Sequence, residues 1–436
     1  MKKALALLLA AVMILSLAAC GSTEGSRETA AGTAAEDALP SGKIVFLSNR
    51  TDLDNDGTYA EMIARFNEQY PDVEVEVQTA TDYNGELATR LQTEEYGDVL
   101  MVASSFVPNT ELSKYFAPYG TLEELGEKYT EEYLYGMYYD GQVYGIPHLV
   151  SCDGFVYNKA VFEKAGITKL PATPEEFVEA MQMIKDNTDA IPYYTNTAAG
   201  WPLNGWTGNC YASCTGDPDY QKNILPHDAK AYTPEGPLYV GFKLLHDIVN
   251  LGLTESDPYT TDWESSKMMM NNGEIGCMNL GLWAIKQIQD AGEHPEDISI
   301  MPFPYTVDGK QYAGAGPDLG YAINVHTKNP EAARAFVEFM VEQSNLALDC
   351  GSISVVKSDP LPAGLEAFEN VQFVVARPAT EENTGLFDAV QQDSGITLED
   401  GGLRAAAVVD IARGASNETF EEFMAALAED WAAAVK

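Results

Sequence analysis

Carboxylates are the most abundant side chains that could do chemistry in this chain, with 66 Asp and Glu against 26 Lys and Arg and only five His. Two carboxyl groups about 5 to 10 Å apart would suit the hydrolysis of a glycosidic bond. Such pairs occur throughout so acidic a chain, so the pattern neither identifies nor excludes a hydrolase. The sequence has no Gly-x-Ser-x-Gly, no Walker loop and no His-Glu-x-x-His. We therefore predict that the protein is not an enzyme.

Metal-binding patterns are also incomplete. Residues 52–57 begin like a calcium-binding EF-hand loop, but Ile63 stands where the loop needs a bidentate Glu. We instead expect Asp56 or Thr58 to cap the following helix, with residues 49–52 in the loop before it. Cys210 and Cys214 are spaced by one helical turn, yet no second Cys or His pair accompanies them. We predict that the protein binds no metal and no cofactor. We expect most of its cysteines to be small residues of the hydrophobic core.

Cys20 is the residue best placed for covalent modification. Lys2 and Lys3 precede a short apolar run that ends in small residues and this cysteine, the order of a bacterial lipoprotein signal. The run is shorter than the roughly 20 residues of a bilayer span. We predict a signal peptide at 1–19, lipidation at Cys20 and a flexible tether at 20–41, whose composition buries little apolar surface. An ordinary signal peptide with an incidental cysteine is the alternative.

The net charge of the chain limits the kinds of ligand that it can bind. The formal charge of -40 repels nucleic acid and anionic lipid, so we expect neither as a ligand, although a local basic pocket could override the global field. No later segment is long and apolar enough to span a membrane. About 395 residues follow the tether, more than one hydrophobic core usually serves, which predicts two lobes.

The order of elements predicts an α/β protein. A strand at 43–47, a helix from 57 to 70, an alternating strand at 73–77, a helix at 83–93 and a buried strand at 98–102 form the start of a parallel sheet. Further strands are expected near 154–157, 274–279 and 321–325, with helices at 174–186, 234–250, 262–271, 282–290 and 330–342. The tail from 398 is expected to be helical, with a stripe made of Phe420, Phe423, Leu427 and Trp431.

Several short motifs occur in an order that resembles the solute-binding proteins of bacterial ABC importers, in particular the carbohydrate-binding group that includes maltose-binding protein. They lie at residues 66–73, 97–99, 140–147, 157–162, 201–203, 281–283 and 328–333. Each motif is weak alone, but their common order from residue 43 onward is specific. The resemblance implies a hinged, two-lobed α/β fold of the periplasmic-binding-protein type II kind, with the ligand cleft between lobes. The lobes are expected at 42–148 with 303–352, and at 149–302 with 353–436.

The resemblance also implies a site for sugar. Sugars present hydroxyls to planar polar side chains and apolar C–H faces to aromatic rings, so a sugar cleft combines the two. Trp283 follows Gly281 where the family places a ring in the cleft, and residues 201–206 have the right composition. The expected ligand-binding residues are Asn49, Arg50, Asp52, Ser104, Ser105, Asp153, Trp201, Trp206 and Trp283. Trp263 and Trp431 lie on helical stripes and are expected in the core, and Asp98 is expected to be structural.

The chain departs from maltose-binding protein at several cleft positions. Val102 and Ser105 stand where that protein has a stacking Trp and an Asp, and Ser151 stands where it has a Glu. The fold is therefore expected to transfer better than the specificity.

We interpret the chain as a lipid-anchored receptor that captures an oligosaccharide and delivers it to the permease subunits of an ABC transporter. We expect a monomer held at the cell membrane by its N-terminal lipid, at the extracellular face or in a periplasm. An exported glycoside hydrolase and a binding protein for another neutral solute are the alternatives.

Overall fold

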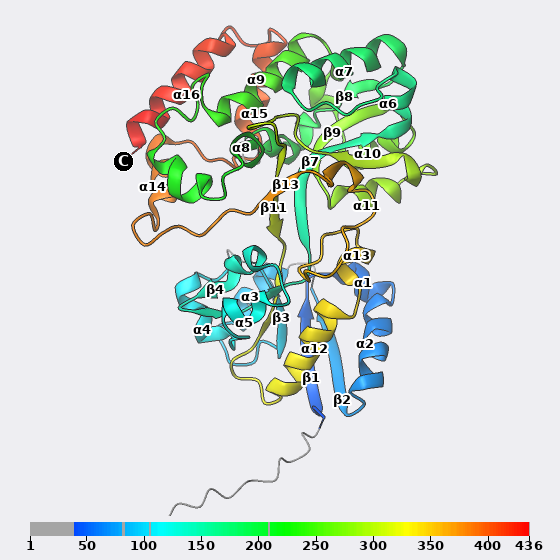
Figure 1. The fold of residues 1–436 in the computed structure, drawn as a ribbon, viewed down its shortest axis with the longest axis vertical. Helices are drawn as coiled ribbons and strands as arrows, with labels where there is room; N and C mark the ends of the chain where they lie inside the picture. The colour runs from blue at the N-terminus through cyan, green and yellow to red at the C-terminus, as the bar shows by residue number, and fades with distance from the viewer. Residues whose placement is uncertain (1–38, 81–82, 104–105, 208–209, 436) are drawn as a thin grey trace, which may run out of the picture. The chain divides into compact units, whose positions relative to one another are not determined.

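The computed structural model describes residues 39–80, 83–103, 106–207 and 210–435 (Figure 1). The predicted signal peptide, Cys20 and most of the tether lie outside the described residues, as do Ser104 and Ser105. All elements below belong to the compact unit Pro40–Lys436. No helix of the described part has the length and apolar character needed to cross a bilayer.

The first sheet has five strands in the order β2-β1-β3-β12-β6. Its strands are β1 (Gly42–Ser48), β2 (Val73–Thr79), β3 (Val99–Val102), β6 (Ile146–Pro147) and β12 (Gly320–Ile323). β1 pairs in parallel with β2 and β3, whereas β12 runs antiparallel to β3 and β6. The predicted β-α-β-α-β start of a parallel sheet is confirmed.

Helices cover this sheet, and small elements complete it. They are α1 (Thr51–Asn55), α2 (Thr58–Gln69), α3 (Tyr83–Arg90), α4 (Leu112–Tyr115), α5 (Leu122–Gly126), α12 (Pro330–Glu342) and α13 (Leu346–Asp349), with 3₁₀ turns η1 (Asn109–Glu111) and η2 (Glu131–Met137) and a hairpin of β4 (Tyr138–Tyr139) and β5 (Gln142–Val143). Phe336 of α12 packs edge-to-face against Phe46 and Phe66, at 5.3 and 5.4 Å between ring centroids. Edge-to-face rings add stability beyond the apolar area they bury.

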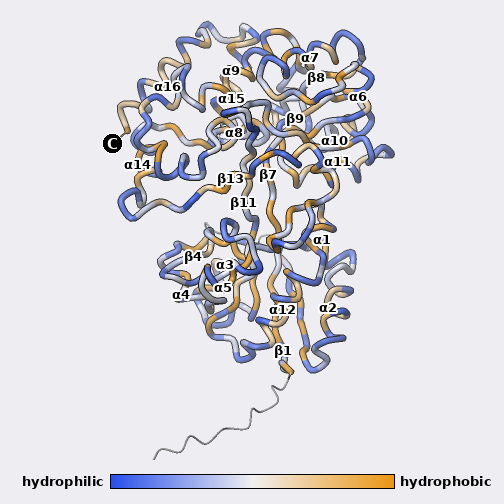
Figure 2. The backbone as a smooth tube through the Cα atoms, viewed as in Figure 1, coloured by the Kyte–Doolittle hydropathy of each residue, from blue (hydrophilic) through white to orange (hydrophobic). Residues whose placement is uncertain are grey.

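The second sheet has six strands, with the path β13-β11-β7-β9-β8 and β10 paired to β7. Its strands are β7 (Val150–Asn158), β8 (Ile191–Tyr193), β9 (Ile275–Gly281), β10 (Ile298–Met301), β11 (Tyr312–Pro317) and β13 (Gln372–Val374). Both faces of β7 and β9 are covered, so these strands are mostly buried. The tube coloured by hydropathy shows the apolar character of these central strands (Figure 2).

The remaining elements pack around the second sheet. They are α6 (Lys159–Ala165), α7 (Pro174–Asn187), α8 (Cys210–Thr215), α9 (Pro237–Asn250), α10 (Trp263–Asn271), α11 (Ala284–Gln289), α14 (Leu386–Ser394), α15 (Leu403–Ala412) and α16 (Phe420–Ala434), with short turns η3 (Thr197–Ala199), η4 (Trp201–Trp206), η5 (Tyr220–Ile224), η6 (Leu225–His227), η7 (Pro258–Thr260), η8 (Pro295–Asp297) and η9 (Glu366–Phe368). On α16, Phe420, Leu427 and Trp431 of the predicted stripe are buried, and its fourth member, Phe423, is partly buried against the same core. Cys210 and Cys214 are free and buried, as expected.

The chain passes between the two sheets three times. Around His148 and Leu149 the first passage pairs with the second, because the His148 amide donates to Leu319 O at 3.1 Å and the Asp318 amide donates to Leu149 O at 3.1 Å. The third passage follows Lys357, whose amide still bonds to Lys128 O beside the first sheet. The first passage lies at residues 148 and 149, and the lobe boundary at 148 stays a prediction.

The other two passages come later in the chain than the expected boundaries at 302 and 352. β10 and β11 both pair with β7, so residues 303–317 belong with the second sheet. The amide of Thr130 donates to Val355 O, so residues up to about 357 stay with the first. Strand pairing sets these boundaries, and β11 has a Gly-rich sequence with no alternation to announce it.

Of the local predictions for residues near β1, the structural role of Asp98 is confirmed and the position of residues 51 and 52 is wrong. The Asp98 carboxylate accepts hydrogen bonds from the Val45 amide at 2.8 Å and from the Thr327 hydroxyl, so its structural role is confirmed. Residues 51 and 52 were expected in a loop, but they begin helix α1. The expected cap of α2 at Asp56 or Thr58 is wrong: the N-cap is Gly57, with a left-handed backbone and no side-chain cap, although Asp56 accepts from the Thr58 amide at 2.9 Å.

Candidate functional site

A cavity of about 260 Å³ opens beside the middle of β7. Ser151 and Asp153 line it from β7, and they share a face because alternate strand residues point the same way. Tyr211 and Ala212 of α8 line another wall, and Trp283 a third. Residues of β11, the end of β13 and the segment after β13 complete the lining: Gly314, Ala315, Gly316, Pro317, Val374 and Ala376.

The polar groups that line this cavity are a serine hydroxyl, a carboxyl group and a phenol. The Ser151 hydroxyl is buried, and no group of the described residues hydrogen-bonds to it. Burial, and secondarily the charge of Glu399, raises the pKa of Asp153 to about 7. Burial, followed by the charges of Asp153 and Glu399, raises the pKa of the Tyr211 phenol, which therefore stays protonated at neutral pH. The cavity thus offers an acceptor, a donor and a hydroxyl to a ligand rich in hydroxyls.

Strand register brings Trp283 to this cavity. Asp153 lies opposite Gly281, the last residue of β9, and the Leu282 amide donates to Cys152 O at 2.9 Å. The Trp283 ring then folds back over Gly281, where an added Cβ would lie 2.6 Å from two ring atoms. Gly281 therefore has to be glycine for the ring to lie where it does. The Trp283 side chain remains 38% exposed, which suits stacking on a ligand.

Trp283 belongs to a cluster of three tryptophans. Trp201 lies 5.5 Å from it and Trp263 lies 6.0 Å from it, measured between ring centroids. Trp201 and Trp263 are 5.2 Å apart and nearly perpendicular, and the Lys267 ammonium lies over the Trp263 ring at 5.4 Å. Trp201 is 39% exposed. Three rings from η4, α10 and the end of β9 thus share one partly exposed apolar surface.

Trp206 is a correction to the predicted site. Its side chain is fully buried, and its indole N–H donates to the Tyr193 hydroxyl at 2.8 Å. It packs edge-to-face against Phe155 of β7. Trp206 is five residues from Trp201 in the same short turn, and it points into the core of the second sheet while Trp201 points outward. The ring offers no surface to a ligand.

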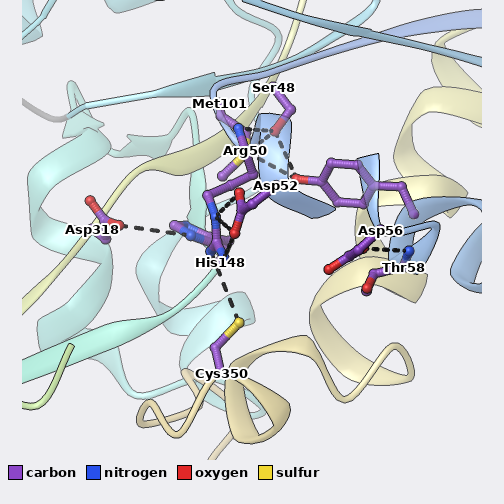
Figure 3. A network of polar contacts seen from close by, with 10 residues as sticks. Ser48, Arg50, Asp52, Asp56, Thr58, Met101, His148, Asp318 and Cys350 are labelled. Atoms are coloured by element: carbon purple, nitrogen blue, oxygen red, sulfur yellow. Dashed lines mark hydrogen bonds and ion pairs between the residues drawn. The ribbon is translucent and has the colours of Figure 1, made fainter. Parts of the chain in front are cut away.

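Arg50 and Asp52 form a separate group just after β1 (Figure 3), and Asn49 directly precedes them in the chain. The Arg50 guanidinium donates to the Asp52 carboxylate at 2.9 and 2.7 Å, and these bonds lower the pKa of Asp52. Arg50 also reaches the Cys350 sulfur at 3.9 Å. Asn49 Oδ1 is buried without a partner among the described residues.

The structure brings only some of the predicted residues together. Asp153 and Trp283 line one cavity, and Trp201 packs on Trp283. No hydrogen bond of the described residues links the Arg50 group to this cavity, so its role in binding stays a prediction, and Ser104 and Ser105 lie outside the described residues.

The predicted ligand-binding residues leave out three residues of the site. Ser151 was noted only as a cleft position of the family, and a strand period of two would have placed it on the same face as Asp153. Trp263 was assigned to the core from its helical stripe, but its ring is only partly buried. Nothing in the sequence around Tyr211 signals its place beside Asp153.

This arrangement defines a binding protein with a partly aromatic, partly polar site, and comparisons with known proteins agree. The sequence model of the family described as "Bacterial extracellular solute-binding protein" matches residues 51–345. The chain belongs to this family, which is one of binding proteins, so it is not an enzyme. The family that the order of the short motifs predicted is confirmed.

Solved structures show the same fold. A binding protein of an ABC transporter from Bifidobacterium animalis subsp. lactis, in complex with mannobiose, is 39% identical and has a TM-score of 0.76, covering 91% of this chain and 95% of the other. A manno-oligosaccharide specific solute-binding protein from the same organism, with mannotriose, is 37% identical at a TM-score of 0.76 and the same coverage. Among curated proteins, the multiple sugar-binding protein of Streptococcus mutans is 25% identical over 74% of each chain. The predicted two-lobed α/β fold is confirmed.

Proposed function

We propose that this chain captures an oligosaccharide outside the cell and delivers it to the permease of an ABC transporter. The observation that carries the proposal is the cavity where the exposed Trp283 ring, the Asp153 carboxyl group and the unpartnered Ser151 hydroxyl meet. A ring that stacks on a C–H face beside groups that bind hydroxyls is the combination a sugar requires. The printed ligands of the similar solved structures support the same class and make manno-oligosaccharides the first candidates.

Calorimetric titration tests this function directly. We expect mannobiose or mannotriose to bind, and free mannose, maltotriose and raffinose serve as comparisons. Chromatography of the recovered sugar should return it intact, since a binder breaks no bond and a glycoside hydrolase would. If no oligosaccharide releases or absorbs heat, and none raises the melting temperature, the ligand is another solute and the proposal is wrong. A ligand at 100 times its Kd should stabilise the protein by about 2.7 kcal/mol.

The lipid anchor is part of the proposal. We propose that Cys20 holds a monomeric protein on the outer face of the membrane, where captured sugar reaches the permease. Cys20→Ala should release the protein into the medium or periplasm, because the variant has no cysteine to carry the lipid that holds the protein at the membrane. Fractionation and immunoblotting measure this, with Cys350→Ala as a control that should leave the protein in the membrane fraction. Full retention of the Cys20 variant would contradict the anchor.

Lobe closure gives a further prediction. Only a closed form lets both lobes desolvate and bind the sugar, so differential affinity for that form should shift the population toward it. Small-angle scattering should therefore show a smaller radius of gyration at saturating sugar. An unchanged radius would argue against closure.

The same scattering and titration experiments in EDTA should give unchanged results. The carboxylates of residues 52–56 are already engaged: Asp52 by Arg50, Asp54 by the Thr79 hydroxyl and Asp56 by the Thr58 amide. Affinity that is lost in EDTA and restored by calcium would show that this loop, or the exposed group of His294, Glu296 and Asp297, holds a metal.

A further inference from the structure

A buried carboxylate, that of Glu255, is hydrogen-bonded to the loop that leads to Trp201, and the Arg413 guanidinium acts on it through charge without forming an ion pair. Glu255 is only 8% exposed, and no ion pair of the described residues includes it. Its two carboxylate oxygens accept the Thr195 amide at 3.2 and 3.0 Å, and one of them also accepts the Thr195 hydroxyl. Tyr193 and Thr254 form an isolated parallel β-bridge. This bridge places Thr195 beside Glu255, although 60 residues separate them in sequence. Burying a carboxylate costs desolvation free energy, and the hydrogen bonds from Thr195 offset part of that cost.

The carboxylate sets the direction of a chain of hydrogen bonds. An ionised carboxylate only accepts, so the Thr195 hydroxyl must donate to Glu255 and use its lone pairs elsewhere. The Thr195 hydroxyl oxygen accepts from the Thr197 amide at 3.2 Å, and it lies 2.6 Å from the Thr197 hydroxyl oxygen. Thr197 begins the turn η3, and the Gly200 amide, just before Trp201, donates to Thr197 O at 3.0 Å. Glu255 is thus linked through two threonines to the backbone that carries Trp201.

The same loop also holds Trp263. Asn196, between the two threonines, has a left-handed backbone with a φ of 54°, which Asn tolerates better than most residues. Its amide donates to the Ser266 hydroxyl at 3.2 Å, and that hydroxyl donates to Trp263 O at 2.8 Å. The Ala198 amide donates to the Thr261 hydroxyl at 3.0 Å. One buried network therefore ties the loop 195–200 to the start of α10.

We propose that Glu255 is a positioning residue for ligand binding: through Thr195, Thr197 and Asn196 it holds the loop that sets Trp201 and Trp263 against Trp283. No hydrogen bond of the described residues joins Glu255 directly to any of the three rings. The inference rests on the proposed sugar-binding function, since it assigns Glu255 to the aromatic platform of that site. Stacking depends on where a ring lies, so a loosened loop weakens binding without removing any contacting group.

Glu255→Gln tests the proposal, because the amide keeps the size of the side chain but presents N–H groups toward the Thr195 amide. We expect the affinity for mannotriose to fall about tenfold, a loss of about 1.4 kcal/mol. Asp98→Asn is the matched control: Asp98 also accepts one backbone amide and one threonine hydroxyl, but in the first sheet. It should lower the melting temperature by a similar amount and leave affinity unchanged. If both variants lose affinity equally, or Glu255→Gln loses none, the positioning role is wrong.

Two further measurements separate positioning from general destabilisation. Once Trp201→Ala has removed the positioned ring, Glu255→Gln should cost less affinity than in the wild type, and fully additive losses would overturn the proposal. Acrylamide, a neutral quencher, should quench tryptophan fluorescence more in Glu255→Gln than in Asp98→Asn without any sugar. This readout tests positioning even if no oligosaccharide binds, in which case the proposed function fails and Glu255 is judged by quenching alone. Should Glu255→Gln not fold, Thr195→Val removes the same link and takes the same tests.

Discussion

Trp283→Ala is expected to weaken oligosaccharide binding at least tenfold and to leave the folded protein nearly as stable as the wild type. The ring is 38% exposed, lines the cavity beside Asp153 and packs on two other rings that are themselves partly exposed. Its removal therefore takes stacking area from the ligand and little packing from the core. Calorimetric titration with mannotriose measures the affinity, and a denaturant curve measures the free energy of unfolding.

Trp431→Ala is the control for this prediction. Trp431 is fully buried on α16, and its indole N–H donates to Asp228 O at 3.0 Å. The same substitution there should cost about 3 to 5 kcal/mol of stability and leave the affinity of the folded protein unchanged. A Trp283 variant that is destabilised like Trp431→Ala, yet binds as tightly as the wild type, would place Trp283 in the core and remove it from the site.

Asp153→Asn should weaken binding by about ten- to a hundredfold, the range of about 1.5 to 3 kcal/mol for a hydrogen bond to a charged group. Sugar hydroxyls that donate to the carboxylate favour its ionised form. In the wild type, where the pKa of Asp153 is raised to about 7, affinity should therefore increase as the pH rises from 6 to 8. Affinity of the Asn variant should be flat over this range. A wild-type affinity that is independent of pH would show that the ligand does not bind this carboxylate.

The same substitution should have the opposite effect on stability. Burial raises the folded-state pKa of Asp153 above its value in the unfolded chain, so the folded protein holds this proton more strongly. The stabilisation from the protonated form is complete below about pH 4 and is lost as the pH rises through about 7. Without ligand, Asp153→Asn should therefore melt at a higher temperature than the wild type at pH 8, and the advantage should shrink toward pH 4. Differential scanning calorimetry at both pH values measures this, and a variant less stable at pH 8 would contradict it.

The prediction succeeded wherever local periodicity and neighbouring residues decide structure. Helix α12 occupies the predicted residues 330–342, because apolar residues at helical spacing bury one face wherever the helix packs. The stripe that buries Trp431 was visible for the same reason. The family was also recognisable, since the order of its short motifs is a property of the sequence alone.

Sequence by itself therefore determined the strongly periodic elements, the family and the kinds of side chain available for binding, but neither helix α1 nor strand β11. The tertiary structure decided which of them meet. Trp201 and Trp206 occupy one short turn, and only packing on Phe155 buries one while the other stays exposed. Asp153 reaches Trp283 because antiparallel register places it opposite Gly281, and Glu255 reaches Thr195 across 60 residues because Tyr193 and Thr254 form a β-bridge. Register and burial depend on contacts between residues far apart in the chain, and no local pattern records those contacts.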